Sequence, residues 1–358
     1  MKPVYIIAEA GVNHNGSHEM AFRLVDAAVQ AGADAVKFQT FKAEKLVTKN
    51  SQKANYQKQS TGDESQFTML KQLELAHDTH HKLAKYCRKN FIDFLSSAFD
   101  SKSLNFLVKD IGLSRLKIPS GEITNGPLLL EHALTGCDLI LSTGMTTMSE
   151  VENALGVLAF GLMNSSNSHI EPSRAAFQDA YSSEEGRRLL KKKVTLLHCT
   201  TEYPAPIIEI NLNAMLTMRS IFDLKVGYSD HSEGITIPTA ATALGAIMIE
   251  KHFTLDRKLP GPDHKASLEP KELKSMVDAI RVVELALGNG KKEVTPSELN
   301  NQDIVRKSLV ASREIKKGEI FDESNIEIKR PGTGVSPMLY WNYLGEKATK
   351  SLNPDQPL

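Results

Sequence analysis

The chain has 358 residues, of which 41% are hydrophobic and 24% charged, and its formal net charge is zero. This composition is typical of a globular protein with a substantial core, and it provides no overall field that favours nucleic acid or an anionic membrane. The three cysteines, Cys87, Cys137 and Cys199, are widely spaced and odd in number, which indicates a reducing compartment rather than a disulfide framework. The N-terminal apolar run is too short for a signal peptide or a membrane span, so we expect a cytoplasmic protein.

Short apolar runs alternate with segments of helical periodicity along most of the chain. The apolar runs predict buried strands, and apolar residues at three- and four-residue spacing predict helices between them. The predicted strands cover residues 4–10, 33–40, 91–97, 115–118, 139–143, 194–199, 225–229 and 246–252. The predicted helices cover residues 17–31, 78–88, 101–108, 127–134, 148–160, 213–222, 237–244 and 270–287. Strict alternation, with polar residues at most strand ends, favours a closed (β/α)8 TIM barrel over an open doubly wound sheet.

Two insertions and a change of composition set the expected domain organisation. Residues 41–75 are polar and lysine-rich and are long for a loop between a strand and a helix, so we expect them to cover a site. Residues 163–188 are rich in Ser, Asn and Glu and predict a surface excursion. The composition predicts a barrel domain over 1–288, a polar linker over 289–303, and a small domain of short strands and turns over 304–358.

Two histidines follow consecutive predicted strands. His231 comes directly after the strand at 225–229 and His252 ends the strand at 246–252, a separation of 21 residues that fits one strand–helix step. Because consecutive parallel strands are neighbours, both imidazoles are expected at one mouth of the barrel, within reach of one atom. This arrangement predicts a two-imidazole metal site on the catalytic face. The alternative is a pair of unrelated polar residues at strand ends.

Lysines and hydroxyl groups follow the earlier strands. Lys37 and Lys117 lie in the second and fourth strands, and Ser97, Ser120 and Ser142 lie at the ends of the third, fourth and fifth. Two ammonium groups and several hydroxyls around one point can surround a compact dianion such as a phosphate ester. A lysine that extends to solvent, or one that forms a Schiff base, remains the alternative for each lysine.

Two carboxylates are candidates for proton transfer. Glu9 ends the first strand and Glu122 follows the fourth. At the mouth of the barrel beside a metal, either could act as a general acid or base. The alternative is that each forms a structural ion pair with a lysine.

A series of motifs makes the chain resemble the sialic acid synthase family over essentially its whole length. The motifs are IIAEAGVNHNGS, AVKFQTFKAEKL, KIPSGE, LSTGM, LHCTTEYPAP, VGYSDHS, EKHFTLD, GPDHKASLEP and KRPGTG. The resemblance implies a (β/α)8 barrel followed by an antifreeze-like (SAF) domain. It also implies a domain-swapped homodimer, in which the small domain reaches the active site of the partner subunit.

The resemblance assigns roles to individual residues. It implies that His231 and His252 bind a divalent metal, usually manganese, with magnesium and cobalt as alternatives. It implies that phosphoenolpyruvate contacts the following residues: Lys37, Lys117, Ser97, Ser120 and Ser142. It implies that the sugar contacts Glu9, Gln39, Tyr203 and Asp263. Thr201 and Ser229 are further expected substrate contacts. Arg330, in KRPGTG, would reach the acyl amide of the sugar from the partner subunit.

The implied reaction joins phosphoenolpyruvate, an open-chain N-acetylated sugar and water to give a nine-carbon sugar acid and phosphate. From the sequence we expect N-acetylmannosamine as the sugar and N-acetylneuraminate as the product. The alternative is N,N'-diacetyllegionaminate made from 2,4-diacetamido-2,4,6-trideoxymannose. The KIPSGE motif makes a pseudaminic acid synthase less favoured. A Schiff-base aldolase that uses Lys37 or Lys117 is a remoter alternative, and a carbohydrate- or ice-binding protein is an alternative of a different class.

Overall fold

The computed structural model describes residues 3–54, 65–165 and 171–358. The chain divides into two compact units, Met1–Gly288 and Asn289–Leu358. The two insertions predicted at 41–75 and 163–188 each extend partly outside the described residues, over 55–64 and 166–170.

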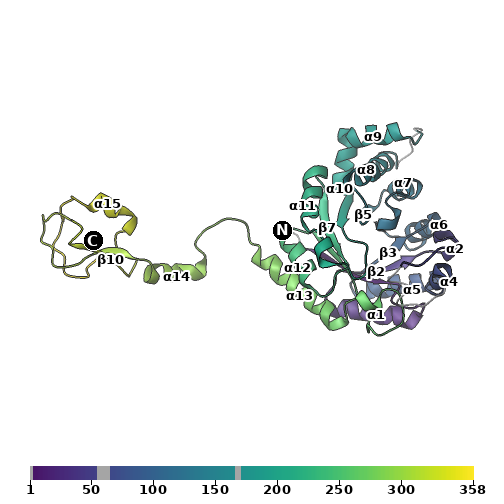
Figure 1. Cartoon of the computed structure of the whole chain (residues 1–358), viewed down its shortest axis with the longest axis horizontal. Coiled ribbons are helices and arrows are strands. Elements are labelled where there is room, and N and C mark those ends of the chain that lie inside the picture. Colours follow the sequence, from purple (N-terminus) through teal and green to yellow (C-terminus); the bar gives the residue numbers. More distant parts are fainter. Residues whose placement is uncertain (1–2, 55–64, 166–170) are drawn as a thin grey trace. The chain divides into compact units, whose positions relative to one another are not determined.

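The larger unit is a closed barrel of eight parallel strands, with β8 returning to pair with β1 (Figure 1). The strands are β1 (Tyr5–Gly11), β2 (Ala35–Thr40), β3 (Asp93–Ala98), β4 (Arg115–Ile118), β5 (Asp138–Ser142), β6 (Val194–His198), β7 (Lys225–Asp230) and β8 (Met248–His252). Each strand pairs in parallel with the next one in the sequence. The predicted TIM barrel is therefore confirmed, and the open sheet is excluded.

Helices lie outside the strands (Figure 1). They are α1 (His18–Ala31), α2 (Ala43–Leu46), α4 (Gln66–Gln72), α5 (His77–Lys89), α6 (Ser101–Asn105), α7 (Gly126–Leu134), α8 (Met148–Met163), α9 (Arg174–Ser182), α10 (Glu184–Lys193), α11 (Asn213–Phe222), α12 (Thr236–Ala243) and α13 (Pro270–Ala286). Side-chain caps explain several of the boundaries. The Ser17 hydroxyl accepts a hydrogen bond from the backbone of Met20, and Thr147 forms a reciprocal capping box with Glu150.

The third strand begins two residues later than predicted. Phe91 was expected in this strand because it opens an apolar run, but it has φ +56° and is almost fully exposed. Its backbone belongs to the turn after α5, where Asn90 closes the helix through hydrogen bonds to the last carbonyls. The buried strand therefore starts at Asp93, and its apolar content comes from Phe94 and Leu95.

Two apolar layers hold the barrel together. A small cluster fills the interior of the barrel, and it consists of Ile7, Ala35, Leu95, Ile140, Leu197 and Met248. A much larger apolar layer lies between the strands and the surrounding helices. The interior is therefore a packed core, and polar side chains are left for the carboxyl ends of the strands.

The smaller unit has its own core. Its elements are α14 (Pro296–Val305), the antiparallel pair β9 (Ser308–Ala311) and β10 (Ile326–Lys329), and α15 (Tyr340–Tyr343). Its buried apolar residues include Leu309, Ile315, Phe321 and Leu352. Part of the predicted linker at 289–303 is therefore helical. Pro296 at the first helical position and a capping box between Thr295 and Glu298 explain where α14 begins.

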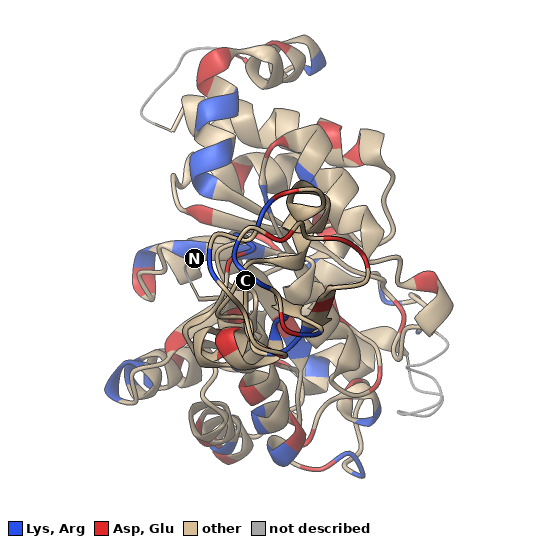
Figure 2. Ribbon diagram, turned by 90° about the vertical axis from the view of Figure 1, so that its left-hand side faces the viewer, with Lys and Arg blue, Asp and Glu red and all other residues tan. Residues whose placement is uncertain are grey.

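Basic and acidic residues are interspersed over the ribbon, in agreement with the zero net charge (Figure 2). Within the part of the chain that the structure describes, no helix combines the length and the hydrophobicity needed to cross a lipid bilayer.

Candidate active site

A cavity of about 280 Å³ lies at the carboxyl ends of the barrel strands. Its lining includes the following residues that were predicted from the sequence: Glu9, Lys37, Gln39, Ser97, Lys117, Ser120, Ser142, Thr201, Tyr203, Ser229, His231, His252 and Asp263. They come from all eight strand ends or from the loops that follow them. The closed barrel brings these residues together because every parallel strand ends at the same mouth.

A cluster of four charged side chains occupies the floor of the cavity. Lys37 Nζ lies 2.8 Å from Glu9 Oε2 and 3.4 Å from Glu250 Oε2, and Lys117 Nζ lies 3.2 Å from Glu250 Oε1. All four side chains are at most 4% exposed. Lys37 also donates a hydrogen bond to Ser97 Oγ at 3.2 Å, and Ser229 Oγ donates to Glu250 Oε1 at 2.8 Å. Ser229 therefore orients the carboxylate of Glu250.

The protonation of this cluster follows from burial and pairing. Burial raises the pKa of Glu9 to about 7, although the ammonium group of Lys37 opposes the shift. Burial also acts to raise the pKa of Glu250, but the ammonium groups of Lys117 and Lys37 outweigh it and lower that pKa. Two lysines thus face one ionised carboxylate, Glu250, and a second, Glu9, whose pKa lies near 7, while burial lowers the pKa of Lys117. With both lysines protonated the cluster has surplus positive charge, which suits an anionic ligand.

Glu250 was not selected as a site residue from the sequence. It lies two residues before His252 in β8, and both line the cavity. Side chains at positions i and i+2 of a strand share one face, so placing His252 at the mouth also places Glu250 there. This alternation was the signal in the sequence that would have identified it.

His231 and His252 lie side by side, with ring centroids 5.5 Å apart. The ring of Tyr203 packs against His231 at a centroid distance of 4.2 Å. Burial lowers the pKa of His231 to about 4, and burial together with repulsion from His231 lowers the pKa of His252 well below its usual value. Both imidazoles are therefore neutral near pH 7, which is the form that binds metals.

The hydrogen bonds of the two rings leave nitrogen atoms uncommitted. His231 Nδ1 donates to the carbonyl oxygen of Thr200 at 2.6 Å, which fixes the tautomer and leaves Nε2 as the basic atom. His252 Nδ1 is buried without a hydrogen-bond partner, and Asp263 Oδ2 lies 3.9 Å from it. Across the described ranges, no three His, Cys, Asp or Glu side chains converge on a metal position. The residues present therefore fit a cation that takes two imidazoles and oxygen ligands from water or substrate.

The end of β5 forms a close-fitting cradle around Ser120. The backbone N–H of Gly144 donates to Ser120 Oγ at 3.0 Å, and Cys199 Sγ lies 3.2 Å from the same oxygen. A Cβ at Gly144 would collide with Thr201 Oγ1 and lie 2.9 Å from Ser120 Oγ. Thr201 Oγ1 and Ser142 Oγ are buried without hydrogen-bond partners. Such unpaired hydroxyls at a cavity wall are ready to bind a ligand.

The insertion after β2 contributes an apolar wall to the cavity. The lining residues from this insertion include Leu46, Val47, Met69, Leu70 and Leu73. They belong to a small cluster that also contains Val12 and Phe41. The sequence-based expectation that 41–75 covers a site agrees with this arrangement. The lysines of the insertion, however, do not line the cavity among the residues described.

Two predicted site residues lie outside the cavity lining. Glu122 ends the 3₁₀ turn Ser120–Glu122, and its Oε2 accepts a hydrogen bond from Asn125 at 2.7 Å. Its neighbours Ser120 and Gly121 line the cavity, so Glu122 is next to the site without contributing to its wall. Arg330 lies in the smaller unit, where it is exposed directly after β10.

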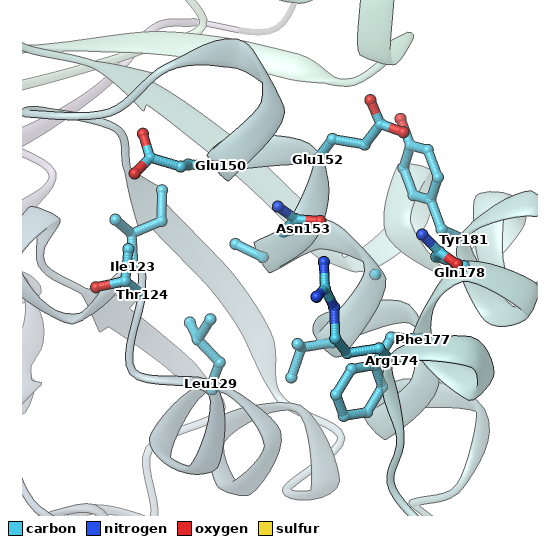
Figure 3. Close-up of a pocket in the computed structure, with 14 residues that line it drawn as sticks. Ile123, Thr124, Leu129, Glu150, Glu152, Asn153, Arg174, Phe177, Gln178 and Tyr181 are labelled. Carbon is cyan, nitrogen blue, oxygen red and sulfur yellow. The ribbon is translucent and has the colours of Figure 1, made fainter.

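A second cavity, of about 370 Å³, lies between α7, α8 and α9 (Figure 3). It is the larger of the two, but among the described residues it shares no lining residue with the mouth of the barrel and has no lysine, histidine or cysteine in its lining. In Figure 3, Arg174 points toward Asn153, and Glu152 lies beside Tyr181. The converging lysines, histidines and unpaired hydroxyls identify the barrel mouth, rather than this cavity, as the candidate active site.

Comparisons with known proteins agree with this class of fold and site. Residues 24–292 match the NeuB family, and residues 306–358 match the SAF domain. The N,N'-diacetyllegionaminic acid synthase of Campylobacter jejuni is 48% identical over 99% of both chains. The enzyme of the same name from Legionella pneumophila is 43% identical over 98% of this chain and 91% of that one.

A solved structure supports the same assignment. The N-acetylneuraminic acid synthetase of Leptospira borgpetersenii is 35% identical, with a TM-score of 0.66, over 84% of this chain and 90% of that one. The fold and site therefore define a barrel enzyme with an appended SAF domain. More particularly, this chain belongs to the NeuB family.

Proposed function

We propose that the protein is an N,N'-diacetyllegionaminate synthase, which condenses phosphoenolpyruvate with open-chain 2,4-diacetamido-2,4,6-trideoxymannose and water. The observation that carries this proposal is that the 48% and 43% identical relatives, matched over nearly the whole chain, are both N,N'-diacetyllegionaminic acid synthases. The sequence motifs alone favoured N-acetylneuraminate. The comparisons favour the alternative product, so the proposed sugar changes and the proposed chemistry does not.

The charged floor is the proposed site for phosphoenolpyruvate. Lys37 and Lys117 would bind its anionic groups, with hydroxyl contacts from Ser97, Ser120 and Ser142. Support comes from the surplus positive charge of the cluster and from the unpaired hydroxyl of Ser142. Binding of a dianion would also offset the positive charge of the two buried lysines, which share the Glu250 carboxylate.

A divalent cation, with Mn²⁺ as the first candidate, is proposed to bind between His231 and His252. When bound, it would polarise the aldehyde oxygen of the open-chain sugar. The protein residues around it have roles of their own. Gln39, Tyr203 and Asp263 line the cavity and are the proposed hydrogen-bonding partners of the sugar.

Glu9 is the proposed general base. C3 of phosphoenolpyruvate attacks the aldehyde carbon, water adds at C2, and the tetrahedral adduct releases inorganic phosphate. Glu9 would accept the proton of the attacking water, and its pKa of about 7, which suits proton transfer near neutrality, supports this role. Lys37 and Lys117 stabilise the negative charge on the departing phosphate.

The apolar wall formed by Leu46, Met69, Leu70 and their neighbours supports a deoxygenated, doubly acetylated sugar. A methyl group at C6 and two acetamido methyl groups bury apolar surface against such a wall, whereas a hydroxyl at C6 would lose its hydration there. N-acetylmannosamine carries that hydroxyl and lacks the second acetamido group.

The test compares the two sugars at matched concentrations, with phosphoenolpyruvate saturating and phosphate release as the signal. We expect kcat/KM for the 2,4-diacetamido-6-deoxy sugar to exceed that for N-acetylmannosamine by about tenfold or more, as one hydroxyl and one acyl contact allow. Equal values, or a preference for N-acetylmannosamine, would contradict the proposed sugar while leaving the proposed chemistry intact.

A Schiff-base aldolase is the competing chemistry. The carboxylates of Glu250 and Glu9 overcome the effect of burial and raise the pKa of Lys37, so this lysine stays protonated and is a poor nucleophile. Burial lowers the pKa of Lys117, which keeps it as the one candidate for this chemistry among the two. Borohydride trapping of pyruvate on Lys117 would favour the aldolase, and release of one phosphate per product would exclude it.

We also propose that the active unit is a homodimer in which Arg330 serves the site of the partner subunit. Support comes from the position of this exposed arginine in the matched SAF domain. Mixed dimers of Arg330→Ala and His252→Ala chains test the idea. One wild-type site would re-form in each mixed dimer if Arg330 acts across chains, and none would re-form if it acts within its own chain.

A further inference from the structure

A buried ion pair lies on the outer face of the two strands that carry the histidines. Ser229, His231, Glu250 and His252 line the cavity, so the residues between them in β7 and β8 point away from it. These are Asp230 and Lys251, which are 0% and 1% exposed. They are register partners on neighbouring strands, and Lys251 Nζ contacts Asp230 Oδ2.

The pair holds the chain on both sides of His231. Lys251 also donates a hydrogen bond to the carbonyl oxygen of Ser232, the residue that follows His231. Asp230 Oδ1 accepts from the backbone N–H of Ser232 at 3.0 Å and from its hydroxyl at 2.7 Å. Lys251, which precedes His252, therefore contacts both Asp230, which precedes His231, and Ser232, which follows it.

Stability does not explain this arrangement well. The outer face of a barrel strand packs against helices, and the residues there are usually apolar. A buried ion pair often stabilises the fold no more than hydrophobic residues of similar size would. The ion pair does supply directional bonds between the two strand ends. These bonds fix the backbone at both histidines relative to each other, which apolar contacts do less well.

We propose that Asp230 and Lys251 are positioning residues that set the separation of the two imidazoles for a shared divalent cation. The inference rests on the metal role that the proposed function gives to His231 and His252. It extends that role to two residues that touch neither the substrate nor the cation. Outer residues that orient metal ligands typically change metal affinity by about 10- to 100-fold when they are replaced.

The test replaces both charges at once, in the variant Asp230→Leu/Lys251→Met, so that no buried charge is left unpaired. Binding of Mn²⁺ to the metal-stripped full-length protein is measured by the electron paramagnetic resonance signal of free Mn²⁺. Thermal unfolding of the metal-free protein is measured in parallel. We expect Mn²⁺ to bind about 10- to 100-fold more weakly, with a metal-free Tm equal to or above that of the wild type. Activity should recover in part when Mn²⁺ is raised.

The control is Arg281→Met/Asp34→Asn, which removes a partly exposed ion pair at the opposite end of the barrel with a distance of 2.8 Å. It should change Tm without changing Mn²⁺ affinity. If the Asp230→Leu/Lys251→Met protein does not fold, Asp230→Asn is measured instead, because it keeps the shape of the side chain and removes its charge.

The outcomes separate the inference from the proposed function. Wild-type Mn²⁺ affinity in Asp230→Leu/Lys251→Met, or in Asp230→Asn where that variant replaces it, would overturn the inference alone. Absence of Mn²⁺ binding in the wild type would overturn the metal role of the histidines, and the inference would fall with it.

Discussion

Two groups of buried charges lie on opposite faces of the barrel wall, and β8 contributes one residue to each, Glu250 to the inner group and Lys251 to the outer one. The inner group, facing the cavity, consists of Glu9, Lys37, Lys117 and Glu250, and it has two ammonium groups that share Glu250. The outer group is the pair Asp230 and Lys251, with one charge of each sign and with its bonds directed to Ser232. Both groups are almost completely shielded from solvent.

The difference between the two groups shows how to distinguish a binding site from a structural connection. The outer pair is neutral overall, and its hydrogen bonds are made within the protein. The inner group has surplus positive charge, and hydroxyls beside it at Ser142 and Thr201 have no hydrogen-bond partners. Both groups are equally buried, so burial alone does not identify a binding site. Uncompensated charge and hydroxyls without hydrogen-bond partners do identify one.

The largest effect should come from breaking the histidine pair. His252→Ala would leave one imidazole to hold the proposed cation, which would weaken its binding and its proposed polarisation of the aldehyde, so condensation should fall by at least about 10³-fold. Phosphate release and Mn²⁺ binding would be measured together, with circular dichroism as a check of folding. His81→Ala, at an exposed helical position, serves as the control and should be active. Normal turnover of the wild type under strong chelation would count against the metal role.

The next largest effect should come from the inner charge group. Lys117→Met removes one of the two ammonium groups and leaves Glu250 with a single ammonium partner, so kcat/KM for phosphoenolpyruvate should fall by about 10²- to 10³-fold. Initial rates over a range of phosphoenolpyruvate concentrations would measure it. Lys191→Met, which breaks an exposed ion pair with Asp223, is the matched control and should be neutral. A loss of less than tenfold for Lys117→Met would be inconsistent with a direct anion contact.

A smaller effect is expected at the cradle around Ser120. Gly144→Ala introduces a methyl group that collides with Thr201 Oγ1 and crowds Ser120 Oγ, so KM for phosphoenolpyruvate should rise by about tenfold. Because the Thr201 hydroxyl is the closest obstacle, Gly144→Ala/Thr201→Ala should regain part of the loss. The two substitutions are therefore expected to be non-additive. Strictly additive effects would show that the crowding is elsewhere.

The smallest effect is expected in the pH dependence of the rate, which the protonation of Glu9 should control. Its pKa of about 7 lies above the ordinary value, so a base at this position gains protons, and the enzyme loses rate, as the pH falls through 7. Below that point kcat/KM should decrease about tenfold per pH unit. Glu9→Gln should be slow and should lack this limb of the profile. A wild-type profile that is flat between pH 5.5 and 7.5 would remove Glu9 from the role of base.

Much of the site could be predicted from the sequence because parallel strands end together. Apolar runs located the strand ends within about two residues, and the polar residues there included the histidines and lysines that the cavity brings together. Glu250 was not predicted because it lies within a strand and not directly after an apolar run. Only the alternation of side chains along β8 indicates that it faces the cavity. Glu122 was placed at the mouth because it follows β4, whereas the 3₁₀ turn points its carboxylate to Asn125.

Other features depended on the folded chain. The apolar wall formed by Met69, Leu70 and their neighbours comes from an insertion whose lysines dominate its composition, so the composition pointed to a polar cover. Helix α14 was predicted as a linker because it is polar on all sides and has no apolar stripe; only its caps and Pro296 indicate a helix. Phe91 shows the reverse, since an apolar residue beside an apolar run is exposed when the backbone turns.

The sequence by itself determined the barrel, the family resemblance and the identity of most cavity residues, because periodicity and the order of motifs are local properties of the chain. Only the tertiary structure decided how the charges are paired: that Glu250 joins Lys37 to Lys117, and that Lys251 joins both neighbours of His231. The physical reason is that ion pairing depends on distances between side chains from different strands. Those distances are set when the barrel closes, and no spacing along a single chain records them.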